Sequence, residues 1–229
     1  MQAGDVRLGQ VFANHQQNVI PHFQRPYVWS QERNWEPLWQ DIRLAAEEVE
    51  REGSSSVAAG SERTYFLGAV VLQQRKVSPK KLSSWYVIDG QQRLTTLQVL
   101  LAACRQTASD LGESSLAAKF TSLIENQKDI VHPDHPEDKY KVWPLPQDRE
   151  TFLWAVDGLE GATPSPDPEH KLTQARNWFG QTVAEWAAEA EDPGLRLGYL
   201  YETVYERMQL VKIALEQNDD PQVIFDLLF

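Results

Sequence analysis

Residues 85–97 read WYVIDGQQRLTTL, and this stretch decides the fold. Its first four residues are apolar or aromatic and favour a buried strand, which ends at an acid followed by Gly90. Beyond the arginine, leucines recur at helical spacing to about residue 108, which predicts a helix. A strand, a glycine turn and a helix start in succession favour an anion site, because the first N–H groups of a helix lack partners within it.

The side chains at this turn suit a phosphate. Arg93 offers a planar fork of donors for phosphate oxygens. Asp89 lies where a carboxylate could hold Mg²⁺ or orient a water, and Gln91 or Gln92 could position an attacking water. Thr95, further into the helix, could reach the same site. The alternative is that Asp89 only caps the helix and Arg93 pairs with a carboxylate elsewhere.

A second motif, FQRPYVW at residues 23–29, is an aromatic loop. Two prolines five residues apart exclude a helix there. Arg25 is a second candidate phosphate clamp, and Tyr27 or Trp29 could stack on a base. The alternative is that the rings fill the core and Arg25 forms a structural ion pair.

Periodicity predicts the remaining elements. Expected strands are one or two short segments within 6–20, then 65–72 (buried on both faces), 85–88, 140–143 and 208–215. Expected helices are 31–52, 116–130, 147–156, 170–191 and 195–206, and a further helix begins at 221. The apolar residues of that last segment have nothing after them to pack on. We therefore expect either a fragment or a final segment that docks on this domain or on a partner.

Composition is that of a soluble globular chain, with 41% apolar and 24% charged residues in 229, which excludes collagen, coiled coil and wholesale disorder. The net charge of −11 argues against a protein that coats DNA non-specifically. Residues 1–110 carry 12 Lys/Arg and 11 Asp/Glu, whereas residues 111–229 carry 10 and 22, so the N-terminal half remains free to meet a phosphate. Lys80 and Lys81 belong to a basic turn that is either solvated or in contact with a DNA backbone.

A few residue types indicate the compartment of the protein and its capacity to bind metal. The sequence contains no apolar run of about 18 residues that could span a membrane, and its N-terminus lacks the apolar core of a signal peptide, so we expect a cytoplasmic protein. The single cysteine, Cys104, excludes an internal disulfide and is expected to be a buried thiol. His132 and His135 are expected to lie in a solvated loop, because metal binding needs about four ligands.

Both motifs belong to a series of four stretches along the chain. These are IPHFQRPYVWS at 20–30, WEPLWQDI at 35–42, YFLGAVVLQ at 65–73 and YVIDGQQRLTTLQVLLAA at 86–103. Together with QNDDPQVIFDLL at 217–228, they resemble the N-terminal domain of GmrSD-type modification-dependent restriction proteins, phosphorothioate-sensing members included.

The resemblance implies an α+β fold. A small sheet similar to those of ParB and sulfiredoxin would carry the nucleotide site, followed by a mostly helical region. Residues 1–110 are expected to form the nucleotide-binding core. Residues 111–229 are expected to form the helical region with one returning strand near 208–215, as part of the same domain.

The resemblance also implies a function. The family's domain binds and hydrolyses a nucleoside triphosphate (GTP, UTP or CTP) with Mg²⁺. It couples recognition of modified DNA, which in some members is phosphorothioated, to an HNH nuclease module in cis or in trans. This chain carries no HNH signature, so we expect a nucleoside triphosphatase without a nuclease site. A second copy of the chain is a further expected partner, and a membrane is not.

Site roles carry over by position. The expected catalytic residues are Asp89, Gln91, Gln92 and Arg93. The expected nucleotide-binding residues are Gly90, Gln24, Arg25, Arg93 and Thr95. The expected DNA contacts are Tyr27, Trp29, Lys80 and Lys81, and Asp89 is the expected Mg²⁺ ligand. Two other functions remain open: an inactive DNA-reading module, and a protein-interaction subunit that holds a nuclease through its acidic helical half.

Overall fold

A six-stranded mixed sheet organises the chain in the computed structural model, which describes residues 2–53, 63–157 and 164–216. The strands are β1 (Gln2–Arg7), β2 (Gln16–Val19), β3 (Tyr65–Gln74), β4 (Ser83–Asp89), β5 (Val142–Trp143) and β6 (Met208–Leu215), in the order β1-β6-β3-β4-β2-β5. The returning strand β6 lies inside the sheet, parallel to β3 and antiparallel to β1. The predicted α+β fold class is confirmed.

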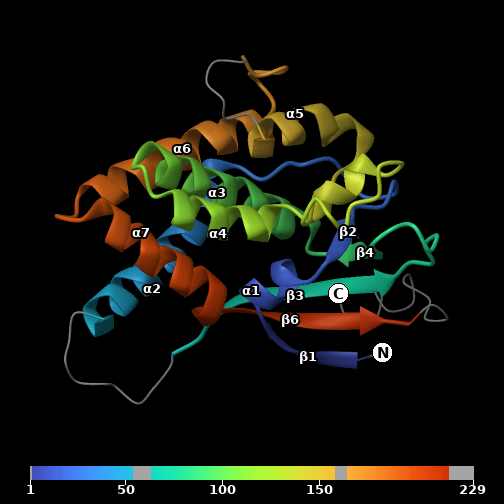
Figure 1. Cartoon of the computed structure of the whole chain (residues 1–229), viewed down its shortest axis with the longest axis horizontal. Coiled ribbons are helices and arrows are strands. Elements are labelled where there is room, and N and C mark those ends of the chain that lie inside the picture. Colours follow the sequence, from blue (N-terminus) through green and yellow to red (C-terminus); the bar gives the residue numbers. More distant parts are fainter. Residues whose placement is uncertain (1, 54–62, 158–163, 217–229) are drawn as a thin grey trace.

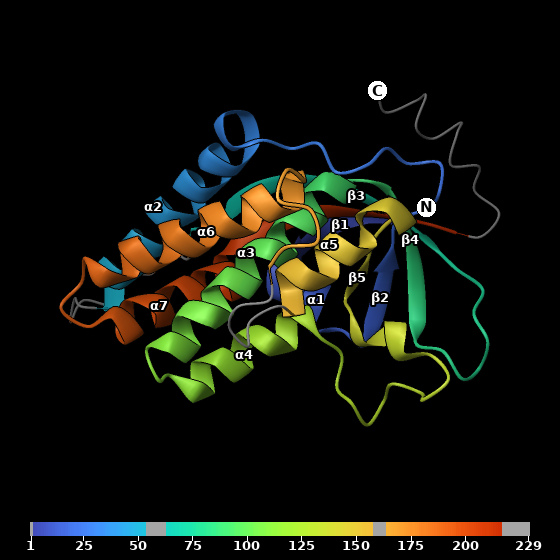
Figure 2. The same ribbon diagram turned by 90° about the horizontal axis from the view of Figure 1, so that it is seen from above.

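The helices gather on one side of this sheet (Figure 1). They are α1 (Leu8–Ala13), α2 (Glu36–Gly53), α3 (Gln91–Asp110), α4 (Ser114–Ile124), α5 (Pro146–Asp157), α6 (Lys171–Ala188) and α7 (Pro193–Glu202). Helix α3 is central and packs against α4, α5 and α6 (Figure 2). Because it is covered on several sides, buried residues run around it instead of forming one stripe. Among the described residues, no helix has the length and apolarity needed to cross a membrane.

Short irregular turns complete the helical layer. A π-turn at Gln31–Trp35 leads into α2, and another at Thr203–Arg207 connects α7 to β6. A 3₁₀ turn at Pro136–Lys139 precedes β5. The helix expected from residue 221 lies outside the described residues.

The prediction of only strands within residues 6–20 is partly wrong, because the helix α1 lies between the strands β1 and β2. Leu8, Val11 and Phe12 are buried, and their spacing is that of one helical face on the core. The helix expected over 116–130 ends early at Ile124, because Glu125 is extended and forms a β-bridge with Tyr140.

Two apolar clusters lie on opposite faces of the sheet. Val70 and Leu72 of β3 face the main core beneath the helices, whereas Val71 between them faces a small second cluster. That cluster also contains Ile88 and Leu215. The expectation that β3 is buried on both faces therefore holds for its centre but not for its start, where Phe66 is 65% exposed.

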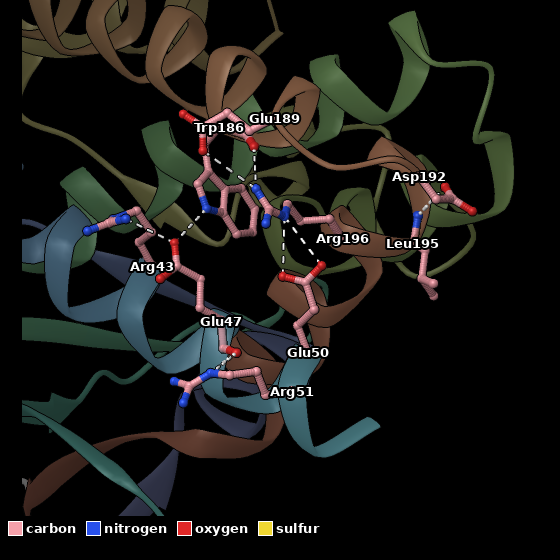
Figure 3. A network of polar contacts seen from close by, with 9 residues as sticks. All are labelled: Arg43, Glu47, Glu50, Arg51, Trp186, Glu189, Asp192, Leu195 and Arg196. Atoms are coloured by element: carbon pink, nitrogen blue, oxygen red, sulfur yellow. Dashed lines mark hydrogen bonds and ion pairs between the residues drawn. The ribbon is translucent and has the colours of Figure 1, made fainter. Parts of the chain in front are cut away.

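Polar contacts tie α2 to α6 and α7 (Figure 3). Trp186 Nε1 donates to Glu47 Oε1 at 3.1 Å. The Arg196 guanidinium covers the Trp186 ring at 5.1 Å and donates from Nε to Glu50 Oε2 at 3.2 Å. Arg43 donates to the same Glu47 oxygen at 2.9 Å. The helix that follows the aromatic loop is thus fixed to the C-terminal helices.

A buried lysine gives the chain a specific pH dependence. Lys141 is 2% exposed, and its Nζ donates to Asn14 O at 3.0 Å and Asn126 Oδ1 at 2.6 Å. Burial lowers the pKa of Lys141 from 10.5 to about 8. Between these values the unfolded chain binds more protons than the folded chain, so the free energy of unfolding contributed by Lys141 rises with pH.

We therefore expect wild type to gain stability over Lys141→Met as the pH rises from about 8 towards 10.5. Chemical denaturation of both proteins at matched pH values measures this difference. Curves that stay parallel across the window would show that Lys141 titrates normally.

Candidate functional site

The two predicted motifs meet at the end of β4. Gln24 Nε2 donates to the carbonyl of Ile88, the penultimate residue of that strand, at 2.7 Å. From the other side, Gln91 Nε2 at the start of α3 donates to the carbonyl of Arg25 at 3.0 Å. The aromatic loop is therefore bound by side chains to the strand and the helix that flank the DGQQR turn.

Gln92 holds the next part of this loop with both ends of its amide. Its Nε2 donates to the Pro26 carbonyl at 2.9 Å, and its Oε1 accepts the Val28 N–H at 2.9 Å. The Gln92 amide thus takes the place of a backbone peptide group on a neighbouring strand, because it accepts from one backbone N–H and donates to one backbone carbonyl. Because one hydrogen bond engages each end of its amide, Gln92 positions the loop in this conformation.

A pocket of about 520 Å³ lies where the two motifs meet. It brings together most of the residues predicted to bind or turn over a nucleotide. Its lining consists of Gln24, Arg25, Trp29, Ile88, Asp89, Gly90, Gln91, Gln92 and Arg93. Thr95, in contrast, is buried in α3 and is not among the lining residues.

The turn into α3 requires a glycine. Gly90 has φ +91° and is the N-cap residue of α3. A Cβ at this position would lie 2.7 Å from Val70 Cγ1, so a side chain is excluded by contact as well as by backbone conformation. No side chain caps the helix, and Asp89 therefore does not have the capping role that was its alternative.

Arg93 lies across an irregular point of β3. Its Nη1 donates to the Ala69 carbonyl at 2.9 Å, where the pairing of β3 with β6 shifts register. Gly68 makes room for it: φ there is +100°, and a Cβ would lie 2.7 Å from Arg93 Nη2. Sequence reasoning missed Gly68, although an isolated glycine in a strand is itself a signal for a bulge or a close approach.

The electrostatics of the pocket favour an anion. Burial lowers the pKa of Arg93, and the Asp89 carboxylate partly offsets that effect. Within the described ranges, neither Arg93 nor Arg25 forms an ion pair with a carboxylate, so the structural pairing considered for each is not observed there. Arg25 is exposed, which leaves its guanidinium available to a ligand.

Tyr27 is an interior residue, 6% exposed. Thr96 Oγ1 donates to the Gln92 carbonyl at 2.8 Å and so accepts from the Tyr27 hydroxyl at 2.6 Å. The Tyr27 oxygen in turn accepts from Trp35 Nε1 at 2.8 Å. Burial raises the pKa of Tyr27 and keeps the phenol protonated. In this conformation its ring fills the core, as the structural alternative required, and is not available to DNA.

The other expected DNA contacts are dispersed. Trp29 is partly buried and lines the pocket. Lys80 and Lys81 lie in the β3–β4 connection and pair with Asp134 at 3.6 Å and Glu137 at 2.7 Å, away from the pocket lining. Exposed apolar surface on the aromatic loop comes instead from Phe23, 74% exposed, and from Val28.

Potential metal ligands and the thiol of Cys104 are the remaining groups that could carry chemistry. No group of three or more His, Cys, Asp or Glu residues gathers as metal ligands in the part of the chain that the structure describes. At the pocket, the Asp89 carboxylate accepts no hydrogen bond from a described residue and suits a Mg²⁺ that arrives with phosphates. Cys104 is fully buried, and burial raises the pKa of its thiol.

Comparison with known proteins adds a family to this geometry. The sequence model of the GmrSD restriction endonuclease N-terminal domain matches residues 8–228. No curated protein matches the chain. The matched range contains both motifs, the whole pocket and every helix of the sheet-covering layer. The chain therefore belongs to the family of GmrSD restriction endonuclease N-terminal domains.

Proposed function

We propose that this chain is a nucleoside triphosphatase that acts as the sensor of a modification-dependent restriction system. Family membership implies a role in a restriction system. The proposal adds that GTP, UTP or CTP binds in the DGQQR pocket, and that its turnover couples recognition of modified DNA to a separate HNH nuclease module.

One observation carries the proposal: the pocket combines a carboxylate, an uncapped helix start and two arginines that form no ion pair within 4 Å with a carboxylate of the described residues. Arg93 and the first N–H groups of α3 would bind phosphate oxygens. Arg25 would clamp them from the aromatic loop. Trp29 supplies an aromatic wall on which a base could stack.

The other polar side chains at the pocket would have separate roles in hydrolysis. Gln91 donates from its Nε2 to the loop, and no described residue forms a hydrogen bond with its Oε1, which would orient an attacking water. Gln92 has one hydrogen bond at each end of its amide. Asp89 would hold the Mg²⁺ that accompanies the triphosphate. That ion would supply charge neutralisation between phosphate oxygens.

A direct binding measurement tests the proposal. Saturation at 100 times the dissociation constant adds about 2.7 kcal/mol to the free energy of unfolding, which corresponds to a rise in Tm of about 5–10 °C at this chain length. We expect this rise with at least one of GTP, UTP, CTP or ATP in the presence of Mg²⁺. Arg25→Ala should reduce it, and Arg33→Ala, an exposed arginine outside the pocket lining, should not.

Two outcomes would contradict the proposal. The first is the absence of a Tm rise with every nucleotide. Modified DNA that binds with a steep salt dependence in that case would favour the inactive DNA-reading module. The second is binding without hydrolysis even when modified DNA is present, which would leave a nucleotide-binding protein that is not an enzyme.

A further inference from the structure

A buried acid in the helical half of the chain, Asp148, binds the backbone of the aromatic loop beside the pocket. Asp148 lies in the first turn of α5 and is 5% exposed. Its Oδ2 accepts the backbone N–H of Tyr27 at 3.0 Å. Its Oδ1 lies 3.2 Å from His170 Nε2. Burying a carboxylate costs free energy unless its oxygens are hydrogen-bonded, and here both are.

His170 has two tasks, and they fix its tautomer. It is the N-cap residue of α6, where its Nδ1 accepts the Leu172 N–H at 3.1 Å. A nitrogen that accepts carries no proton, so in the neutral ring the proton is on Nε2 and is donated to Asp148. The same imidazole thus caps α6 and orients the carboxylate that holds the aromatic loop.

The aromatic loop depends on such contacts because it has no regular structure between β2 and the π-turn before α2. Gln91 and Gln92 hold its backbone from α3, and Asp148 holds it from α5. Tyr27 is only two residues from Arg25. Because Gln91 and Gln92 hold the neighbouring residues, we expect the loss of the bond at Tyr27 to loosen this part of the loop and to position the guanidinium of Arg25 less firmly at the pocket.

We propose that Asp148 and His170 are positioning residues of the nucleotide site, which hold the Tyr27 backbone and thereby keep Arg25 at the pocket. This inference rests on the proposed function for the identity of the ligand. It makes the α5–α6 region a determinant of nucleotide affinity, although Asp148 and His170 are not among the residues that line the pocket. A contact that displaces His170 would weaken the site without touching it.

Matched variants separate positioning from general stability. Asp148→Ala should weaken binding of Mg²⁺–nucleotide by about tenfold or more, since a buried hydrogen bond to a carboxylate is lost. Asp148→Asn should restore part of the affinity. Its amide oxygen can still accept the Tyr27 N–H, but its NH2 group would then face the Nε2–H of His170, so the link to His170 is lost. The control is Asp138→Ala: Asp138 is 2% exposed and also accepts one backbone N–H, from Leu82 at 3.1 Å, but outside the pocket lining.

His170 has its own matched control. His170→Ala removes both a helix cap and the link to Asp148. Asp192→Ala removes only a cap, since Asp192 Oδ1 accepts the Leu195 N–H at 2.9 Å at the start of α7 (Figure 3). We expect weaker nucleotide binding from His170→Ala and unchanged binding from Asp192→Ala, with similar losses of thermal stability.

Amide hydrogen exchange without nucleotide tests the contact independently of the ligand. The Tyr27 N–H should exchange faster in Asp148→Ala than in wild type or Asp138→Ala. Unchanged exchange, or equal effects of Asp148→Ala and Asp138→Ala on binding, would overturn the inference. A wild type that binds no nucleotide would instead overturn the proposed function, and the exchange rates would still decide whether Asp148 holds the loop.

Discussion

Replacing Arg93 by alanine is expected to weaken binding of Mg²⁺–nucleotide by at least about 100-fold while leaving the fold intact. Hydrogen bonds to charged groups contribute about 1.5–3 kcal/mol each, and a guanidinium can offer two in parallel to a phosphate. The fold loses little, because within the described residues the side chain makes one hydrogen bond, to Ala69, and its burial already disfavours the cation. Titration calorimetry and thermal unfolding measure the two quantities.

Two comparisons make this result specific. Arg93→Lys keeps the charge but loses the planar fork, so its affinity should lie between those of wild type and Arg93→Ala. Arg176→Ala is the matched control, because burial also lowers the pKa of this arginine but it is not among the pocket-lining residues. If Arg93→Ala bound nucleotide as tightly as wild type, the assignment of phosphates to this end of the pocket would be wrong.

Gly68→Ala should weaken nucleotide binding strongly, because the added methyl group displaces the side chain of Arg93. The new Cβ would lie 2.7 Å from Arg93 Nη2, and φ of +100° is unfavourable for alanine. Relief requires Arg93 to leave its position over β3. We expect a loss of about 1–3 kcal/mol in the free energy of unfolding, together with a loss of affinity that approaches that of Arg93→Ala.

Gly112→Ala is the control for backbone strain alone. Gly112 also has a positive φ, +79°, but no atom lies within 4 Å of a Cβ built there. It should lower stability and leave nucleotide binding unchanged. Equal effects of the two glycine variants on binding would mean that the affinity follows stability and that Gly68 has no specific relation to Arg93.

Much of the site could be predicted from residue types in local order. A buried strand that ends at Asp89, a glycine and a helix carrying Arg93 can form only a strand–turn–helix unit, and the positive φ of Gly90 agrees with it. The second motif could be identified as a loop because its prolines exclude a helix. That both motifs line one pocket was an expectation from family resemblance, and the pocket brings them together.

The division of roles among those residues could not be predicted in the same way. Tyr27 and Gln92 look equally suited to a ligand and to the core, because aromatic rings and amides serve both. Their partners decide, and these come from distant segments: Thr96 and Trp35 for the Tyr27 hydroxyl, and Pro26 and Val28 for the Gln92 amide.

The sequence by itself determined most helices and strands, since these depend on local periodicity and turn chemistry. Through its family resemblance it also indicated the α+β class and the roles of the DGQQR and FQRPYVW motifs. Tertiary structure alone decided that β6 enters the sheet beside β3, that Gly68 makes room for Arg93, and that Asp148 holds Tyr27 across 121 positions. Such contacts depend on how separate elements pack, and no local pattern of residues encodes which distant group will lie opposite.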